Sequence, residues 1–385
     1  MSAKISGHVA DGFAPVADAF AKGFVDNPNM GAALCVMIDG QPVINLWGGV
    51  ADARTDRAWE ADTPSVIFSC TKGIASLLVA RLVMEGKLAY DAPMAQYWPE
   101  FAPEGKDAIS VGDVLAHRGG LSAPRDVLTV RDIVDAEQMA ARLAAQEPLW
   151  PPGTGYGYHA LTHGWLTGEL VRRATGQSIG GYLASLVTEP LKLDAWIGLP
   201  DRLADRPAHL QVSPLLRALW ADEAAKPEPN WPFRAMTLGN ALPPTLVTET
   251  GGFNTQVIRG AELAGAGGIA TAEALATIWS AAVTPTKGIR LLDDAVIVEA
   301  TRPRSSGAPV FGGEGPYSRW GCGFQLDSEA RRYLSDGCFG HDGAGGQVGF
   351  ADPARRIGFG YVTNYMMGPE DQRATQVLDA LRLLV

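Results

Sequence analysis

Apolar residues recur with two different periods along this chain. Within residues 9–25 they follow helical spacing, which predicts an amphipathic helix. Residues 33–38 and 42–47 are two apolar runs separated by Asp39 and Gly40. Asp-Gly between apolar runs is a preferred sequence for a two-residue turn, so this stretch predicts a β-hairpin.

Helical patterns dominate the middle of the chain, and strand patterns return near its end. We expect helices at residues 76–85, 110–116, 131–146, 161–175, 272–283 and 372–384. We expect strands at residues 320–326, 345–351 and 357–363. This order predicts an α/β (α+β) fold in which one antiparallel sheet, built from both ends of the chain, is flanked by helices. Residues 1–90 and 265–385 would form this α/β domain, and residues 91–264 a mainly helical one.

Composition narrows the class of protein. Hydrophobic residues make up 46% of the chain, as in ordinary globular proteins, and the formal net charge is -10. An acidic balance argues against nucleic acid or an anionic membrane surface as a partner. No apolar run reaches spanning length, and the first residues lack the apolar core of a signal peptide. We therefore expect a cytoplasmic protein, a monomer or a small homo-oligomer. Four cysteines show no paired spacing and are expected to be reduced thiols: Cys35, Cys70, Cys322 and Cys338.

Residues 64–75 run from an extended segment into the helix expected at 76–85 and carry the first candidate chemistry. Ser69 and Lys72 are three residues apart, so both side chains lie on one face if the helix begins here. The positive end of a helix disfavours a protonated lysine and favours a developing anion. A serine nucleophile with a lysine base needs both effects.

Two later motifs add candidate groups. Tyr158 follows a Pro-Gly-Thr-Gly loop and lies at the start of a helix, where a nearby lysine would make its phenol a proton carrier. Residues 338–346 form a glycine-rich strand edge that contains His341. Glycines permit a ligand to approach backbone N–H groups closely, and such groups can stabilise an oxyanion.

Taken together, these motifs carry a family resemblance. Residues 69–72 (Ser-Cys-Thr-Lys), 158–160 (Tyr-His-Ala) and 341–343 (His-Asp-Gly) resemble, in this order and spacing, the penicilloyl-serine-transferase fold, which is β-lactamase- or transpeptidase-like. In particular they resemble the class C β-lactamase-like and penicillin-binding-protein-like esterases known as family VIII carboxylesterases. Segments 85–88, 114–121 and 152–154 support the resemblance, which extends from about residue 30 to the end.

The resemblance implies a role for each matching residue. Ser69 would be the acylated nucleophile, and Lys72 and Tyr158 would share the role of general base. The backbone N–H groups of Ser69 and Ala344 would form the oxyanion hole. Which of the two basic groups takes the first proton stays open, because coupled groups titrate as a pair.

Two departures from the β-lactamase pattern indicate the substrate. Ala160 stands where that pattern has an asparagine that contacts the amide of a β-lactam, and His341 stands where it has a lysine for the substrate carboxylate. An unperturbed histidine is mostly neutral at pH 7. A neutral ester needs neither group, so we expect a serine carboxylesterase that acts on small acyl esters and uses no cofactor or metal. The residues expected to bind substrate are His341, Gly343, Gly345, Trp231 and Phe253.

Other functions remain open at this point. An acyltransferase, or an amidase or D,D-peptidase with weak β-lactam hydrolysis, would use the same residues with a different second substrate. A non-catalytic binding module is disfavoured because Ser69, Lys72 and Tyr158 are all present.

Other serine and histidine motifs have less reactive interpretations. Ser178 lies in Gly-x-Ser-x-Gly, the nucleophile motif of α/β-hydrolases, but a helix instead of a strand is expected before it. We therefore expect Ser178 to cap the next helix. His159 and His163 have the spacing of metal ligands but no third ligand nearby, so we expect a polar helix surface or cleft wall. His117 is expected to brace a turn.

Overall fold

The largest element of the protein is an antiparallel sheet. The computed structural model describes residues 4–385, in which the sheet has nine strands. Strand β4 (Arg57–Ala58) pairs only with β3. The other strands are, in spatial order, β1 (Ile5–Val9), β3 (Gln41–Asp52), β2 (Gly31–Ile38), β13 (Ile357–Thr363), β12 (Val348–Asp352), β11 (Phe339–Asp342), β10 (Gln325–Leu326) and β9 (Arg319–Trp320). Because β2 pairs with β13, the two ends of the chain meet in the middle of the sheet, which confirms the predicted sheet built from both termini.

The hairpin of β2 and β3 forms at the predicted turn. Asp39 and Gly40 both have positive φ, 51° and 76°, as the tightest hairpin turn requires. Strand β2 is buried along nearly its whole length because both of its faces are covered. Leu34 and Val36 belong to one hydrophobic cluster, whereas Cys35, between them, belongs to the other.

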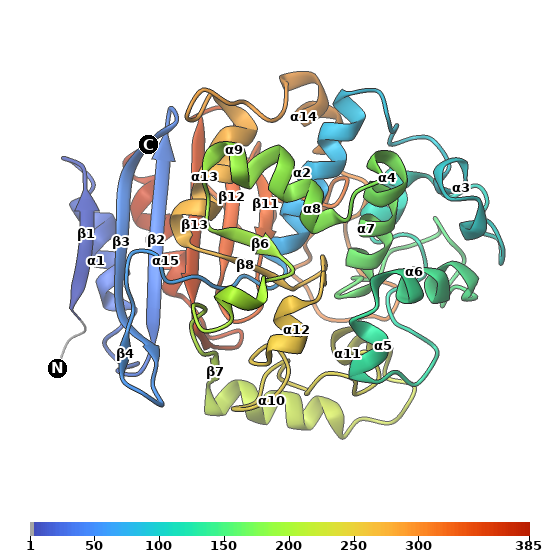
Figure 1. The fold of residues 1–385 in the computed structure, drawn as a ribbon, viewed down its shortest axis with the longest axis horizontal. Helices are drawn as coiled ribbons and strands as arrows, with labels where there is room; N and C mark the ends of the chain where they lie inside the picture. Colours follow the sequence, from blue (N-terminus) through green and yellow to red (C-terminus); the bar gives the residue numbers. More distant parts are fainter. Residues whose placement is uncertain (1–3) are drawn as a thin grey trace.

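Helices cover both faces of the sheet (Figure 1). On one face α1 (Ala14–Lys22) and α15 (Arg373–Arg382) pack against each other and the strands. On the other face lie α13 (Ala272–Val283) and α2 (Cys70–Met84). Helix α13 approaches β13 closely because Gly358 and Gly360, which have no side chain, lie where the strand faces the helix. A Cβ atom on Gly358 would lie 2.3 Å from the carbonyl oxygen of Ala276, so a larger residue would push the helix away.

Among the remaining helices, α7, α8 and α14 contact α2. In Figure 1 the helices α3, α4, α6 and α7 gather on the right, beyond the sheet. The remaining helices are α3 (Met94–Tyr97), α4 (Val111–Leu115), α5 (Val130–Ile133), α6 (Ala136–Ala145), α7 (Thr162–Thr175), α8 (Ile179–Leu183), α9 (Glu189–Leu191), α10 (Pro214–Ala224), α11 (Trp231–Thr237), α12 (Gln256–Gly260) and α14 (Asp294–Ala300). Single 3₁₀ or π turns occur at Pro99–Phe101, Ala184–Thr188 and Asp201–Leu203.

Two small sheets tie this helical part to the large sheet. One has the order β5 (Ser65–Val66), β8 (Gly268–Ala270) and β6 (Ala195–Ile197). The other pairs β7 (Gln211–Val212) with β14 (Tyr365–Met366) in parallel. Since β6 and β7 belong to residues 91–264, that segment also supplies short strands, and both pair with strands from residues 265–385.

Three expected elements differ in detail from the structure. The helix expected within 9–25 covers only Ala14–Lys22, and the segment before it is strand β1, which the sequence did not indicate. The helix expected at 131–146 is two helices, because the Asp135 side chain accepts a hydrogen bond from the Gln138 N–H and starts a new helix there. The strand expected at 320–326 is interrupted by a turn between β9 and β10.

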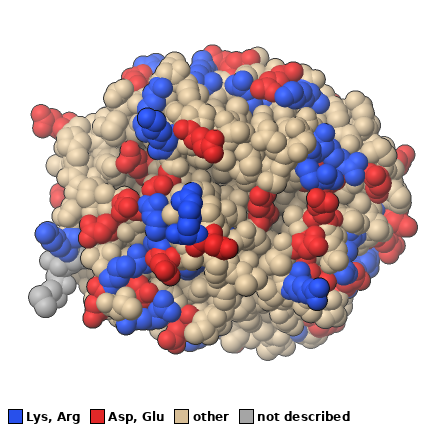
Figure 2. All heavy atoms as spheres, in the orientation of Figure 1, with Lys and Arg blue, Asp and Glu red and all other residues tan. Residues whose placement is uncertain are grey.

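Charged side chains are mixed on the surface that Figure 2 shows. Lysine and arginine alternate with aspartate and glutamate over this face, and neither sign forms an extended patch. No helix among residues 4–385 combines the length and the apolar character needed to cross a membrane.

Candidate active site

Ser69 is the residue that immediately precedes α2. The segment before it is held by β5, which pairs with β8, and by the Ile67 N–H, which donates to the carbonyl of Gly268 at 2.8 Å. Phe68 has a φ of 43°, an uncommon conformation for a residue other than glycine. Strained backbone of this kind persists only where the surroundings fix it, and it occurs often at functional sites.

Lys72 lies one helical turn after Ser69 and is completely buried. Its Nζ atom is 2.9 Å from Ser69 Oγ. The same Nζ donates to two backbone carbonyls, that of Ala160 at 2.5 Å and that of Gly265 at 2.6 Å. Its position is therefore fixed by three separate segments of the chain.

The amine of Lys72 has no carboxylate partner among the described residues. Burial disfavours the charged form and lowers the pKa of Lys72 well below its ordinary value. Burial thus favours the neutral amine of Lys72 next to the Ser69 hydroxyl group.

Tyr158 approaches Ser69 from the loop before α7. Its hydroxyl group is 2.9 Å from Ser69 Oγ, and Lys72 Nζ lies 4.9 Å from the centre of its ring. Burial raises the pKa of the Tyr158 phenol, and the hydrogen bond with Ser69 opposes this only in part. The structure therefore brings Ser69, Lys72 and Tyr158 together, although they lie up to 89 residues apart.

Ser69 and Tyr158 open into a cavity of about 560 Å³. The wall is largely aromatic and apolar, and the described lining residues include no lysine or arginine. The single carboxylate in the wall, Asp342, is paired with Arg331 at 2.7 Å. The lining residues are Ser69, Ser122, Tyr156, Gly157, Tyr158, Ala160, Pro232, Ala235, Met236, Pro309, Phe311, Gly312, Pro316, Tyr317, Ser318, Trp320, Gln325, His341, Asp342, Gly343 and Ala344.

The two backbone N–H groups expected in the oxyanion hole are both free within residues 4–385. Neither the Ser69 N–H nor the Ala344 N–H donates to a protein acceptor. Both residues line the cavity. Unpaired N–H groups at a cavity wall are available to a ligand oxygen.

His341 belongs to β11, forms part of the cavity wall and is almost fully buried. Its Nδ1 is 2.6 Å from the carbonyl oxygen of Asp342, so Nδ1 carries the hydrogen. Burial first, and then the proximity of Lys72, lower the pKa of His341 to about 3. The ring is therefore neutral, as the sequence analysis expected, and Gly343 beside it also lines the cavity.

The other residues expected to bind substrate lie outside the cavity wall. Phe253 is fully buried and packs edge-on against Phe68, with ring centres 5.2 Å apart, so it supports the residue before Ser69. Trp231 is stacked near the guanidinium groups of Arg125 and Arg234, and other residues of α11 reach the cavity instead. Gly345 faces the side chain of Met366, with no part in the lining.

A buried group of histidines behind the site was not anticipated. His159 and His163 were expected on a polar helix surface or cleft wall and His117 in a turn, and all three are at most 1% exposed. The ring of His117 lies 5.6 Å from that of His159 and 5.2 Å from that of His163. Burial lowers the pKa of all three, that of His159 to about 4. Among residues 4–385 no group of three or more His, Cys, Asp or Glu side chains has the arrangement of a metal site.

Ser178 is a helix cap, as predicted. Helix α7 ends at Gly176, which has a φ of 74°, and the Ser178 hydroxyl oxygen accepts a hydrogen bond from the Gly181 N–H at 3.1 Å. Its hydroxyl group donates to Glu262, and within residues 4–385 no histidine or lysine is hydrogen-bonded to it.

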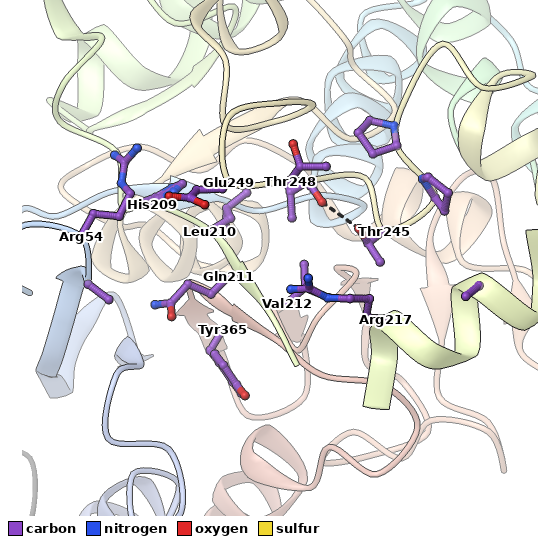
Figure 3. A pocket seen from close by; sticks show the side chains of 15 residues that line it. Arg54, His209, Leu210, Gln211, Val212, Arg217, Thr245, Thr248, Glu249 and Tyr365 are labelled. Atoms are coloured by element: carbon purple, nitrogen blue, oxygen red, sulfur yellow. Dashed lines mark hydrogen bonds between the residues drawn. The ribbon is translucent and has the colours of Figure 1, made fainter. Parts of the chain in front are cut away.

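A second cavity, of about 570 Å³, lies beside β7 and β14 (Figure 3). Arg54 and His209 lie on one side of it and Arg217 on another. It contains neither Ser69 nor either of the groups that contact Ser69 Oγ, so the candidate chemistry belongs to the first cavity.

Comparison with known proteins identifies the family. The model of the Beta-lactamase family matches residues 17–383, which is nearly the whole chain. The chain belongs to the Beta-lactamase family. Its fold is accordingly the β-lactamase fold, and the resemblance seen in the sequence is confirmed.

Relatives within the Beta-lactamase family include esterases. LipL of Mycobacterium tuberculosis, described as an esterase/beta-lactamase, is 33% identical over 375 residues, which cover 93% of this chain and 82% of LipL. The crystal structure of a family VIII carboxylesterase has a TM-score of 0.87 and 33% identity and covers 99% of this chain and 100% of its own. A penicillin-binding protein homologue from Caulobacter crescentus has a TM-score of 0.86 and 36% identity, with 99% and 100% coverage. This Beta-lactamase family member is thus an esterase/β-lactamase-like serine hydrolase.

Proposed function

We propose that this protein is a serine carboxylesterase that hydrolyses small neutral esters through an acyl-enzyme on Ser69. One observation carries the proposal: Ser69 Oγ lies 2.9 Å from both Lys72 Nζ and the Tyr158 hydroxyl, in the wall of a cavity. Contacts of this length to a candidate base are what nucleophilic catalysis requires. The esterase relatives support the same reading.

Lys72 is the first base in this proposal. A neutral amine has two hydrogens and one lone pair. Its two N–H groups donate to the carbonyls of Ala160 and Gly265, which leaves the lone pair for the Ser69 hydroxyl group. As Ser69 Oγ bonds to the ester carbonyl carbon, its proton moves to Lys72 Nζ, and the carbonyl oxygen becomes the oxyanion of a tetrahedral intermediate.

The later steps use the oxyanion hole and the phenol. The N–H groups of Ser69 and Ala344 donate to the oxyanion, which is worth most in a site screened from water. When the intermediate collapses, the bond to the alcohol oxygen breaks and that oxygen takes a proton from the Tyr158 hydroxyl, which recovers one from Lys72. Water then attacks the acyl group, and the same groups act in reverse order.

Absence of a fixed cation supports a neutral substrate. The described residues that line the cavity include no lysine or arginine, and His341 is neutral. A substrate carboxylate would lose its hydrating water on entering the cavity and would gain no partner of opposite charge from the described lining residues. Such desolvation is costly. Aromatic and proline side chains in the wall suit an apolar ester group.

Hydrolysis of p-nitrophenyl acetate and butyrate tests the proposal. Ser69→Ala is expected to remove activity, whereas Ser178→Ala, which changes the serine of the other motif, is expected to keep it. A serine-reactive phosphonate should add to Ser69 only, as read by peptide mass spectrometry. Labelling of Ser178, or full activity of Ser69→Ala, would reject the mechanism. Added short alcohols separate hydrolysis from acyl transfer, because a transferase would form the new ester in preference to the free acid.

A further inference from the structure

We propose that His117 is a positioning residue that holds the Tyr158 phenol against Ser69. This inference rests on the proposed function, because it concerns the same reaction. His117 does not line the cavity, and it is fully buried. It therefore acts through Tyr158 and has no contact with the ester.

His117 binds the backbone on both sides of Tyr158. The N–H of the preceding residue, Gly157, donates to the His117 carbonyl oxygen at 3.1 Å. The N–H of the following residue, His159, donates to His117 Nδ1 at 3.2 Å. His117 thus holds the peptide group before Gly157 and the peptide group that joins Tyr158 to His159, which restricts the main chain around the tyrosine.

The ring of His117 also contacts the tyrosine ring directly. Their centres are 4.9 Å apart, with the planes 64° apart in an edge-on arrangement. Trp320 stacks on Tyr158 at 5.3 Å, and His117 packs edge-on against Trp320 at 4.7 Å. The three rings form one packed group, so the direction of the phenol depends on the position of the His117 ring.

The conformation of His117 itself indicates a specific role. Its φ is 66°, a left-handed conformation that is uncommon outside glycine, although histidine adopts it more readily than most residues. Such a conformation persists where the surrounding structure over-determines it. Here the conformation presents both the carbonyl oxygen and Nδ1 to the segment that carries Tyr158.

The hydrogen bond from the His159 N–H to His117 Nδ1 requires the neutral form of His117. Nδ1 accepts the hydrogen bond from His159 and so must carry a lone pair, which places the ring hydrogen on Nε2. Burial, then the neighbouring His163, His159 and Lys72, hold the pKa of His117 well below its ordinary value. The ring therefore orients Tyr158 without placing a positive charge beside Lys72.

The first test is His117→Asn. Asparagine tolerates positive φ, and its Oδ1 takes the place of Nδ1 as acceptor, but the ring contacts with Tyr158 and Trp320 are lost. Because a misplacement of about 1 Å can cost about 100-fold in rate, we expect kcat to fall about 10- to 100-fold. KM is expected to stay within about twofold, since the residue makes no contact with the cavity. His117→Phe, which keeps a ring and loses the acceptor, serves as the second variant if the first does not fold.

A double-mutant cycle separates positioning from a general loss of structure. In a Tyr158→Phe background, His117→Asn should lower kcat less than about twofold further, because the group that it positions is already absent. His163→Asn is the matched control, since it removes another buried imidazole of the same cluster, one that packs on His117 and makes no ring contact with Tyr158. Its kcat should stay within about threefold of the wild type.

Three results would overturn the inference. These are a full, additive loss in the Tyr158→Phe background, an equal loss in His163→Asn, or a raised KM with kcat unchanged. A crystal structure of His117→Asn decides the matter independently of activity, since the Tyr158 hydroxyl is expected to move out of hydrogen-bond distance of Ser69 Oγ. An unmoved hydroxyl group rejects the positioning role, whereas an inactive wild type rejects only the proposed function.

Discussion

His341→Lys tests why this cavity should prefer neutral esters. In the native protein the His341 ring lines the cavity, and burial is the main cause that keeps it neutral. A lysine at this position would place a cation in a wall whose described residues include no lysine or arginine. The substitution should therefore improve substrates that carry a carboxylate and leave neutral esters without a gain.

The size of the effect follows from Coulomb's law. Unit charges about 4 Å apart attract by about 4 kcal/mol at an effective dielectric constant near 20, and by about 1 kcal/mol in water. Desolvation of both ions removes part of this gain, so a net gain of about 1 to 2 kcal/mol is reasonable for an open cavity. Since about 1.4 kcal/mol is a factor of ten, the ratio of kcat/KM values should shift by about tenfold.

The assay compares two esters with the same leaving group. p-Nitrophenyl acetate is neutral, and the p-nitrophenyl monoester of succinic acid carries a carboxylate on its acyl side. The ratio of their kcat/KM values cancels any general damage to the catalytic groups. His341→Gln is the matched control, because it removes the same hydrogen bond to the Asp342 carbonyl without adding a charge.

An unchanged ratio in a lysine variant that remains folded and still reacts with the phosphonate would show that the missing cation does not set the preference. The same conclusion would follow if the glutamine variant gained as much as the lysine variant, since the cause would then be space and not charge. A gain on the anionic ester alone, restricted to lysine, is the expected result. Thermal unfolding of both variants checks that the lost hydrogen bond, worth about 1 kcal/mol, has not unfolded the site.

Two further predictions concern the base and the support of the nucleophile. Burial lowers the pKa of Lys72, so its active neutral form is present below the ordinary lysine pKa of about 10.4. We therefore expect kcat/KM to rise with pH and to level off well before pH 10. A profile that still climbs steeply at pH 10 would mean that the ammonium is the resting form. Phe253→Ala should lower the free energy of unfolding by about 3 to 5 kcal/mol in a urea titration and change KM by less than about twofold, because this buried ring packs on Phe68. A large change in KM with unaltered stability would instead make Phe253 a substrate contact.

Local signals in the sequence were sufficient for the parts of the fold with strong patterns. The hairpin at Asp39 and Gly40 follows from one turn sequence between two apolar runs, and β13 has the predicted bounds. Strand β1 could not be found in this way. It contains Ser6, Gly7 and His8, and it is a strand only because it pairs with β3 at the edge of the sheet.

In the candidate site, too, local contacts could be predicted from the sequence and long-range contacts could not. The spacing of Ser69 and Lys72 indicated their contact, because residues three apart in a helix share a face. Spacing cannot indicate that Lys72 also binds the carbonyl of Gly265, 193 residues away. That contact depends on Gly164 of α7, where a Cβ atom would lie 2.0 Å from the Gly265 nitrogen. The glycine allows the helix and the 265 segment to touch.

Aromatic and histidine residues were the least predictable. Phe253 was expected to bind substrate, yet its ring is fully buried and packs edge-on against Phe68. His159 and His163 had the spacing of a polar helix face. Both are buried and pack near the ring of His117, which also contacts Tyr158 but lies 42 residues from His159 in the chain.

A common property of the groups around Ser69 explains the proposed substrate and the proposed mechanism together. Lys72, Tyr158 and His341 all have pKa values shifted toward their neutral forms, and burial is the main cause in each case. In the proposed mechanism, attack by Ser69 creates an ammonium on Lys72 and an oxyanion at the same moment, so a neutral site becomes a pair of opposite charges and its net charge does not change. A neutral ester preserves this balance, whereas a carboxylate on the substrate adds a second anion that the wall cannot pair. The described residues of the wall offer no unpaired charge, which favours neutral esters at binding and again in the transition state. The charge introduced by His341→Lys should therefore change selectivity more than it changes the rate of the chemical step.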